Sequence, residues 1–260
     1  MKFWPCFRKD CFPSKRINER NRGNGFWNLM ALFWEQTFKR FPPHQKLLQE
    51  IVENVGQSPS SPDFLLDAGC GPGLLSLELA RRGHKVLGID RSPEMLKRAQ
   101  KRKLMERLDN LSFLQKDLNL ELSSQEYSFY KILFVHSLYL LDDPGQTLRK
   151  VADTLVEGGE ILMCNPSRRL TLAELWAGGW SFLNEGLREK GFLSIFFFLA
   201  IALAMGSLHL VIQYRKKRVY HCWDEKEIEE LLKTSGFRLK WLHKSCLGNS
   251  HLFLCAVKER

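Results

Sequence analysis

The hydrophobic positions in the middle of the chain alternate between short apolar runs and longer stretches with helical spacing. The runs that we predict to be β-strands span residues 64–68, 85–89, 111–115, 129–135 and 160–164. The stretches that we predict to be helices between these strands span residues 74–82, 92–105 and 143–156. Strands and helices that alternate at this spacing are typical of parallel βαβ units with right-handed crossovers.

The pattern breaks after residue 165 and resumes closer to the end of the chain. A helix is predicted over 224–234, where Gly236 ends it. Two β-rich runs follow, over 237–246 and 251–257, and together they predict an antiparallel hairpin. The chain is therefore of the α/β class, with a hairpin after the parallel units.

The composition is that of a chain that folds. Of its 260 residues 44% are hydrophobic and 26% charged, which excludes a wholly disordered protein, a collagen-like repeat and a polytopic membrane protein. The seven cysteines are scattered and odd in number, so they favour a reducing compartment over a disulfide framework. We expect no cleavable signal peptide, because Arg8, Lys9 and Asp10 interrupt the first apolar residues.

The net charge of +10 is unevenly distributed. Residues 1–62 and residues 166–223 each contain five more basic than acidic side chains, and the rest of the chain is nearly balanced. A basic excess is one signature of nucleic-acid binding. Here it accompanies hydrophobic stretches, so we expect a membrane surface and no nucleic acid as the partner.

One motif joins the first strand to the first helix, and it reads Leu65-Leu66-Asp67-Ala68-Gly69-Cys70-Gly71-Pro72-Gly73. Glycines at such a turn let the backbone approach a ligand closely, and the start of the helix offers N–H groups to a polar ligand. Asp90 ends the second strand, where a carboxylate can accept hydrogen bonds from ribose hydroxyls. The G-x-G-x-G spacing differs from the G-x-G-x-x-G fingerprint of nicotinamide dinucleotide folds.

Four segments in this order resemble the class I S-adenosylmethionine-dependent methyltransferases, in particular the subgroup of ubiquinone- and menaquinone-biosynthesis enzymes. They are LLDAGCGPG at 65–73, LGIDRSPEML at 87–96, LQKDL at 114–118, and the run from FVHSLYLLDDP to LRKVADTLVEGGEIL. The resemblance covers residues 63–165 and 223–258. It implies a Rossmann-like seven-stranded sheet, parallel with an antiparallel C-terminal hairpin, and helices on both faces. It also implies S-adenosyl-L-methionine as the cofactor and S-adenosyl-L-homocysteine as the product.

The resemblance assigns a cofactor site to Asp67, Gly69, Cys70, Gly71, Gly73, Asp90, Arg91, Met95, Asp117, Leu118 and His136. The glycines would wrap the methionine part of the cofactor, with Asp67 organising their loop. Asp90 would hold the ribose, and Asp117 would face the adenine amino group. Arg91 and Met95 would lie beside the adenine, and Leu118 would pack next to Asp117. For Met95 and Leu118 ordinary core packing is the alternative. His136 would lie near the sulfonium. The chain departs from many relatives at Phe129-Tyr130-Lys131, where they have Phe-Asp.

The segment 191–214 contains no Asp, Glu, Lys or Arg, and basic residues flank it. A run of this length is typical of a transmembrane helix, and a buried core helix is the alternative. The hairpin that follows should complete the sheet begun before it, so a single crossing would separate the two halves of the fold. We therefore predict a hydrophobic helical insertion that enters and leaves on one face of the membrane, on its cytoplasmic side.

The N-terminal extension combines basic and aromatic residues, among them the patch over residues 26–34. Aromatic rings and basic side chains are favourable at lipid headgroups, and a helical lid on the core is the alternative. The chain would then consist of four parts. They are the basic, aromatic and helical extension at 1–62, the cofactor-binding core at 63–165, the hydrophobic membrane-associating insertion at 166–222, and the end of the core at 223–260.

The chemistry of methyl transfer suggests the remaining candidates. A base is needed only where the acceptor is a poor nucleophile, and His136 is the first candidate for it, followed by Tyr139. A structural hydrogen bond is the alternative role for His136. Arg168 and Arg169 could hold a phosphate headgroup, or could be a solvated surface pair. No cluster has convincing metal-ligand spacing.

The sequence therefore predicts a membrane-associated S-adenosylmethionine-dependent methyltransferase with a lipophilic acceptor. The acceptor would be a phospholipid amine headgroup or a quinone or isoprenoid precursor. Two alternatives stay open, namely a non-catalytic membrane assembly factor that keeps the fold, and a soluble small-molecule methyltransferase.

Overall fold

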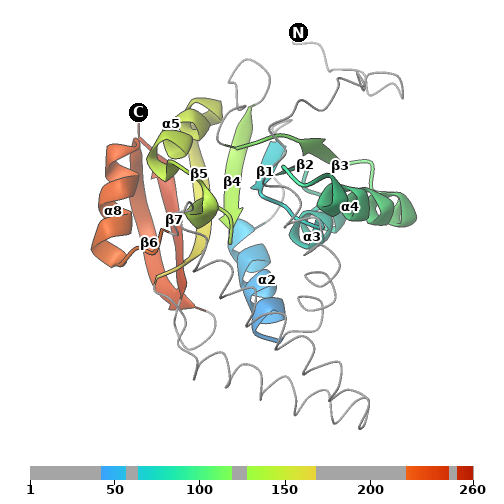
Figure 1. Cartoon of the computed structure of the whole chain (residues 1–260), viewed down its shortest axis with the longest axis horizontal. Coiled ribbons are helices and arrows are strands. Elements are labelled where there is room, and N and C mark those ends of the chain that lie inside the picture. The colour runs from blue at the N-terminus through green and yellow to red at the C-terminus, as the bar shows by residue number, and fades with distance from the viewer. Residues whose placement is uncertain (1–41, 57–63, 119–127, 168–220, 246–250, 260) are drawn as a thin grey trace.

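The structure is a computed structural model that describes residues 42–56, 64–118, 128–167, 221–245 and 251–259 (Figure 1). Its strands are β1 (Phe64–Ala68), β2 (Val86–Asp90), β3 (Leu111–Gln115), β4 (Phe129–Val135), β5 (Leu155–Pro166), β6 (Phe237–Ser245) and β7 (His251–Lys258). Its helices are α2 (Pro42–Val55), α3 (Leu74–Arg81), α4 (Pro93–Glu106), the 3-10 turn η2 (Leu138–Leu140), α5 (Pro144–Thr154) and α8 (Glu225–Thr234). The 191–214 segment, the 26–34 patch and the Arg168-Arg169 pair lie outside the described residues.

The seven strands form one sheet in the order β3-β2-β1-β4-β5-β7-β6. The first five strands pair in parallel, and β7 pairs antiparallel with both β5 and β6. The predicted Rossmann-like sheet with an antiparallel C-terminal hairpin is therefore confirmed. Because the parallel strands all end at one edge, the turns that follow β1, β2 and β4 meet there.

Helices cover both faces of the sheet, as Figure 1 shows. On one face α2 and α3 enclose a buried core with Leu47, Ile51 and Leu79, and α4 packs beside α3 against β2 and β3. On the other face α5 and α8 bury Val151 and Leu232 against the sheet. Each of these large apolar side chains contributes roughly 1.5–3 kcal/mol when it leaves water.

The fifth strand begins earlier than the pattern predicted. Residues 155 and 156 were expected to end the preceding helix, but that helix stops at Thr154. Leu155 is extended and pairs with Phe129 of β4, and the register then shifts before Lys131 pairs with Glu160. Pairing with a buried neighbouring strand thus overrides the helical spacing of the sequence.

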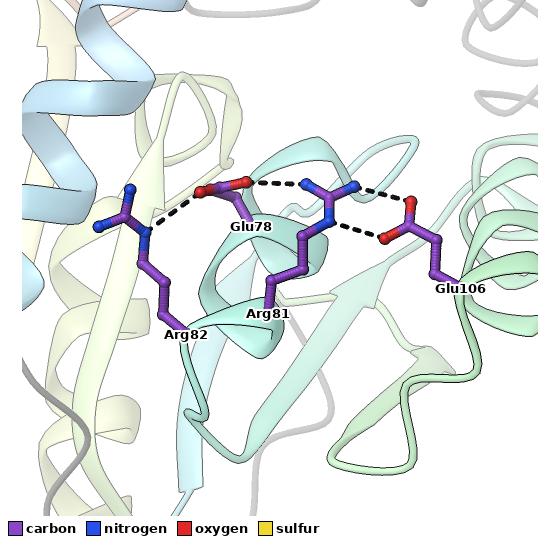
Figure 2. Close-up of polar contacts among 4 residues, drawn as sticks. All are labelled: Glu78, Arg81, Arg82 and Glu106. Atoms are coloured by element: carbon purple, nitrogen blue, oxygen red, sulfur yellow. Dashed lines mark hydrogen bonds and ion pairs between the residues drawn. The ribbon is translucent and has the colours of Figure 1, made fainter.

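Exposed ion pairs join α3 to α4 (Figure 2). The Arg81 guanidinium donates two hydrogen bonds of 2.7 Å to the Glu106 carboxylate, and a third to Glu78. Arg82 also donates to Glu78, at 3.1 Å. Exposed pairs of this kind contribute at most about 1 kcal/mol each. Their two-pronged geometry nevertheless fixes how the two helices lie against each other.

The helix α2 lies in the N-terminal extension that was predicted to be helical, although the pattern gave no bounds for it. The residues that depart from the family pattern hold its C-terminal end. The Lys131 ammonium donates to the Val55 carbonyl at 3.3 Å and pairs with Glu160 at 3.0 Å. Tyr130 lies 2.6 Å from Nδ1 of the buried His84, whose Nε2 lies 3.1 Å from a carbonyl oxygen just after α2. A carbonyl can only accept, so Nε2 carries the proton and Nδ1 accepts from the Tyr130 hydroxyl. Tyr130 and Lys131 therefore dock α2 on the sheet.

Replacing Lys131 tests this docking. The Lys131→Met variant leaves a buried helix-end carbonyl without its donor, and we expect the free energy of unfolding to fall by about 2 kcal/mol in urea titrations. Lys240 pairs with the same Glu160 but is 44% exposed against 10% for Lys131. The control Lys240→Met should therefore cost less than about 1 kcal/mol. Equal losses in the two variants would contradict the proposed docking.

Candidate cofactor and acceptor site

The glycine loop between β1 and α3 depends on backbone geometry that other residues resist. Gly69, Gly71 and Gly73 all have positive φ, at 84°, 53° and 77°. A Cβ on Gly69 would lie 2.5 Å from the Cβ of Ser137, and one on Gly73 would lie 2.8 Å from the Phe113 ring. The loop is therefore glycine-rich both for its conformation and for its close packing against neighbouring elements.

Asp90 holds this loop to the end of β2. Its carboxylate accepts hydrogen bonds from the Gly71 amide at 2.9 Å and from the Ser92 amide at 2.8 Å. Burial raises the pKa of Asp90, and these two amides oppose that rise. A carboxylate has about four acceptor sites, so lone pairs remain for the ribose hydroxyls that the sequence analysis assigned to it.

Asp67 is the second buried carboxylate at this edge. It accepts a hydrogen bond of 2.5 Å from the Ser76 hydroxyl of α3, so its carboxylate holds the helix start rather than the loop itself. Burial raises the pKa of Asp67 to about 6, and the nearby Asp90 adds to the rise. A positive charge in front of these two carboxylates would favour their ionised forms.

A pocket opens between the glycine loop, the end of β2 and the end of β4. The predicted cofactor residues that line it are Asp67, Gly69, Cys70, Gly71, Asp90, Arg91, Met95, Asp117, Leu118 and His136. Gly73 does not line the pocket, and it instead begins α3 and packs on Phe113. Carboxylates, close-approaching glycines and apolar walls together suit a ligand with a cation, hydroxyl groups and a flat ring, so the lining fits S-adenosylmethionine.

The alternatives for Met95 and Leu118 are not exclusive. Leu118 belongs to the core beneath α5 and also lines the pocket. Met95 is 3% exposed and lies in the wall beside Asp90. Both side chains therefore pack as core residues and still present a surface to the ligand.

His136 is the first residue after β4 and has a positive φ of 53°. Such a conformation costs a non-glycine residue about 1–3 kcal/mol and is concentrated at functional sites. Its amide donates to the Cys164 carbonyl of β5 at 2.9 Å, just after the last residue of β4 that pairs with β5. The turn thus aims the His136 side chain into the pocket instead of along the sheet.

Two further histidines lie next to His136. The ring of His44 on α2 has its centroid 6.3 Å away, and the ring of His251 on β7 lies at 4.9 Å in an edge-to-face arrangement. Burial lowers the pKa of His136 well below its ordinary value, and the two neighbours lower it further. Burial also lowers the pKa values of His44 and His251 to about 4. All three imidazoles are therefore neutral at pH 7. No group of three His, Cys, Asp or Glu side chains in the described ranges could hold a metal ion.

Tyr139, the second catalytic candidate, does not line the pocket. It lies in η2, and its carbonyl accepts a hydrogen bond from the His221 amide at 3.3 Å. That bond joins η2 to the segment before α8. A role for the Tyr139 hydroxyl stays a prediction.

The sequence analysis missed the pocket residues that α2 contributes, which are His44 and Leu48. The signal was present in the spacing of Leu47, Ile51 and Val55, which bury one helical face. This helical face lies before residue 64, outside the alternation of strands and helices in the sequence.

Comparison with known proteins defines the class. A family model described as a methyltransferase domain matches residues 60–234, and the chain belongs to this family. A ubiquinone biosynthesis O-methyltransferase from Acinetobacter baylyi is 31% identical over 148 residues, which are 55% of this chain and 60% of that protein. A 23S rRNA (uracil(1939)-C(5))-methyltransferase from Shewanella frigidimarina is 33% identical over 84 residues, which are 32% of this chain and 18% of that protein. The chain thus spans less than two thirds of the length of either relative.

The fold of this chain is also similar to the folds of solved methyltransferase structures. The magnesium protoporphyrin IX methyltransferase of Synechocystis PCC 6803, with bound S-adenosylhomocysteine, superposes with a TM-score of 0.61 at 18% identity. The match covers 91% of this chain and 98% of that one. The predicted resemblance to S-adenosylmethionine-dependent methyltransferases, and with it the cofactor, is confirmed.

One prediction is wrong. The sequence analysis excluded a nucleic-acid partner, but the relatives include the rRNA methyltransferase above and a tRNA 5-carboxymethoxyuridine methyltransferase of Escherichia coli that is 30% identical over 128 residues. Basic residues that accompany hydrophobic stretches do not exclude a nucleic-acid partner. The cofactor core that these relatives share carries no information on the acceptor. Among the described residues, no helix is both long and apolar enough to cross a membrane.

The two carboxylates give the site a testable pH dependence. Asp67 must be ionised to favour the cofactor's positive sulfur, and its pKa is about 6, so affinity for S-adenosylmethionine should fall as the pH is lowered from 7 to 5. The fall should approach about tenfold per pH unit at the acid end. S-adenosylhomocysteine lacks the sulfonium charge and should show a smaller fall in calorimetric titrations. Equal pH dependence for the two ligands, or an unchanged pH dependence in Asp67→Asn, would contradict this role.

Proposed function

We propose that the protein transfers the methyl group of S-adenosylmethionine to a hydroxyl group on a quinone precursor. The observation that carries the proposal is the His136 imidazole, which lines the cofactor pocket and is neutral at pH 7 because burial lowers its pKa. The proposal has two finer parts, namely that the acceptor atom belongs to a hydroxyl group and that the acceptor molecule is a quinone precursor.

A neutral base at this position suits an O–H acceptor. A hydroxyl oxygen is a poor nucleophile until its proton leaves, and a base within hydrogen-bond reach can take it as the C–O bond forms and the C–S bond breaks. The sulfonium loses its positive charge in the same step, while the imidazole gains one. The net charge of the reacting groups is thus unchanged by the step.

The relatives favour a quinone precursor as the first acceptor to test. Two ubiquinone biosynthesis O-methyltransferases align over more than half of their own lengths, 57% and 60%. The 23S rRNA methyltransferase from Shewanella frigidimarina aligns over 18% of its length. RNA is the second acceptor to test, because the tRNA methyltransferase aligns over 49% of its length. A phospholipid amine would depend on Arg168 and Arg169, which lie outside the described residues.

The deciding experiment tests lipid and RNA acceptors in parallel. Purified protein and labelled S-adenosylmethionine are incubated with a membrane-lipid extract and, separately, with total RNA. We expect label in the organic phase, in a product that co-migrates with methylated quinone precursors. Label in phospholipid would mean that the acceptor is a phospholipid and not a quinone precursor. Label only in ribonuclease-sensitive material would overturn the proposal. An Asp90→Ala variant, which loses the carboxylate at the end of β2, reports the background.

The role of His136 is tested by His136→Asn. Asparagine tolerates the positive φ of this position, so the backbone is kept while the base is lost. We expect kcat to fall by about 10²–10⁴-fold, with the KM for S-adenosylmethionine nearly unchanged. At saturating cofactor the wild-type kcat should stay flat from pH 8 to pH 6, since the base protonates only below its lowered pKa. A kcat that is unchanged in the variant would remove His136 as the base.

Membrane association through 191–214 and the N-terminal extension, on the cytoplasmic side, remains part of the proposal. It rests on the apolar run and its basic flanks. Flotation with anionic vesicles should recover the wild-type chain in the lipid fraction. A variant with Phe196, Phe197 and Phe198 replaced by serine should stay at the bottom of the gradient. Wild-type protein that fails to float would contradict the association.

A further inference from the structure

We infer that His251 is a positioning residue that fixes the plane of the His136 ring toward the acceptor. The two imidazoles lie edge to face, with centroids 4.9 Å apart and planes at 88°. His251 does not line the cofactor pocket itself, whereas His136 does. The inference rests on the proposed role of His136 as the base.

Hydrogen bonds fix the backbone around His136. The amide bonds to the Cys164 carbonyl at 2.9 Å, and the hydroxyl of the following Ser137 donates to the Ala68 carbonyl at 2.6 Å. These bonds determine where the side chain begins. Rotation about the bond to an aromatic ring is broad and has no sharp preferred angle. The side chains next to the ring, His44 and His251, therefore help to define which way the ring nitrogens point.

His251 is well placed to do so because it is itself held firmly. It is 6% exposed and opens β7, where it pairs with Pro166 of β5. The next residue on the same face of β7, Phe253, is fully buried under the α2 core. An edge-to-face contact is a favoured geometry for aromatic pairs. His251 thus supports His136 from behind, on the side away from the pocket.

The charges around the pair agree with this division of roles. His44 from α2 and His251 from β7 lie next to His136, and Asp67 and Asp90 line the same pocket as His136. Burial lowers the pKa of His251 to about 4, so it is neutral at pH 7, and a charge on it would lower the pKa of His136.

A pair of substitutions of similar size separates ring contact from filling of space. His251→Phe keeps an aromatic edge against His136, and His251→Leu fills the volume without a ring. We expect His251→Phe to retain kcat within about threefold and His251→Leu to lose about 10–100-fold, as misplaced catalytic groups do. The KM for S-adenosylmethionine should be unchanged in both, since His251 does not touch the pocket.

The kcat values of the His251 and His136 variants distinguish the positioning role from the role of the base. Equal kcat values in the two His251 variants, whether both high or both low, would overturn the positioning role. His136→Asn is measured beside them. If it leaves kcat intact, the proposed base fails and the inference fails with it. If it abolishes turnover while His251→Leu does not, only the positioning role is wrong. The ring-proton resonances of His136 provide a second readout, and they should broaden in His251→Leu but not in His251→Phe.

Discussion

The hydrogen bonds from the Gly71 and Ser92 amides to Asp90 are the interaction on which the site depends. They tie the turn after β1 to the turn after β2, and so place the starts of α3 and α4 side by side. A buried carboxylate is unfavourable on its own, because burial penalises its charge. Two amide donors offset that penalty, and the ligand that binds in front of Asp90 offsets more. The fold therefore keeps a polar group at its centre that is best satisfied when the cofactor is present.

The helix α2 transmits a second constraint to the same edge of the sheet. Its C-terminal end is docked by Lys131 and by the His84–Tyr130 pair, while Glu50 in its middle accepts hydrogen bonds of 2.6 Å from Ser245 and makes a 2.6 Å contact with His243. These contacts come from β4 and β6, on either side of the helix. The N-terminal end of α2, which carries His44, is thereby held over the pocket. The position of His44 is thus set by polar contacts well away from the acceptor.

The sequence was enough to predict the elements whose signals are local. Gly69, Gly71 and Gly73 identify the turn because only glycine accepts its conformation, and the apolar runs of β1 to β4 identify buried strands. The sequence was not enough where a tertiary contact decides. Leu155 is a strand residue because Phe129 pairs with it, and the docking of the C-terminal end of α2 depends on Lys131 of β4. Likewise nothing in the sequence brings His44 and His251 to His136, since three elements far apart in the chain must first fold together.

The arrangement of the site also explains how a histidine with so low a pKa can serve as a base. In the free site the two carboxylates line the same pocket as an uncharged ring, and burial keeps that ring neutral. Methyl transfer takes the positive charge from sulfur and leaves a proton on nitrogen, a few atoms away in the same buried pocket. Burial lowers the pKa of His136 in the free protein, and a bound sulfonium would lower it further. In the proposed step the proton therefore reaches His136 only as the sulfonium is neutralised.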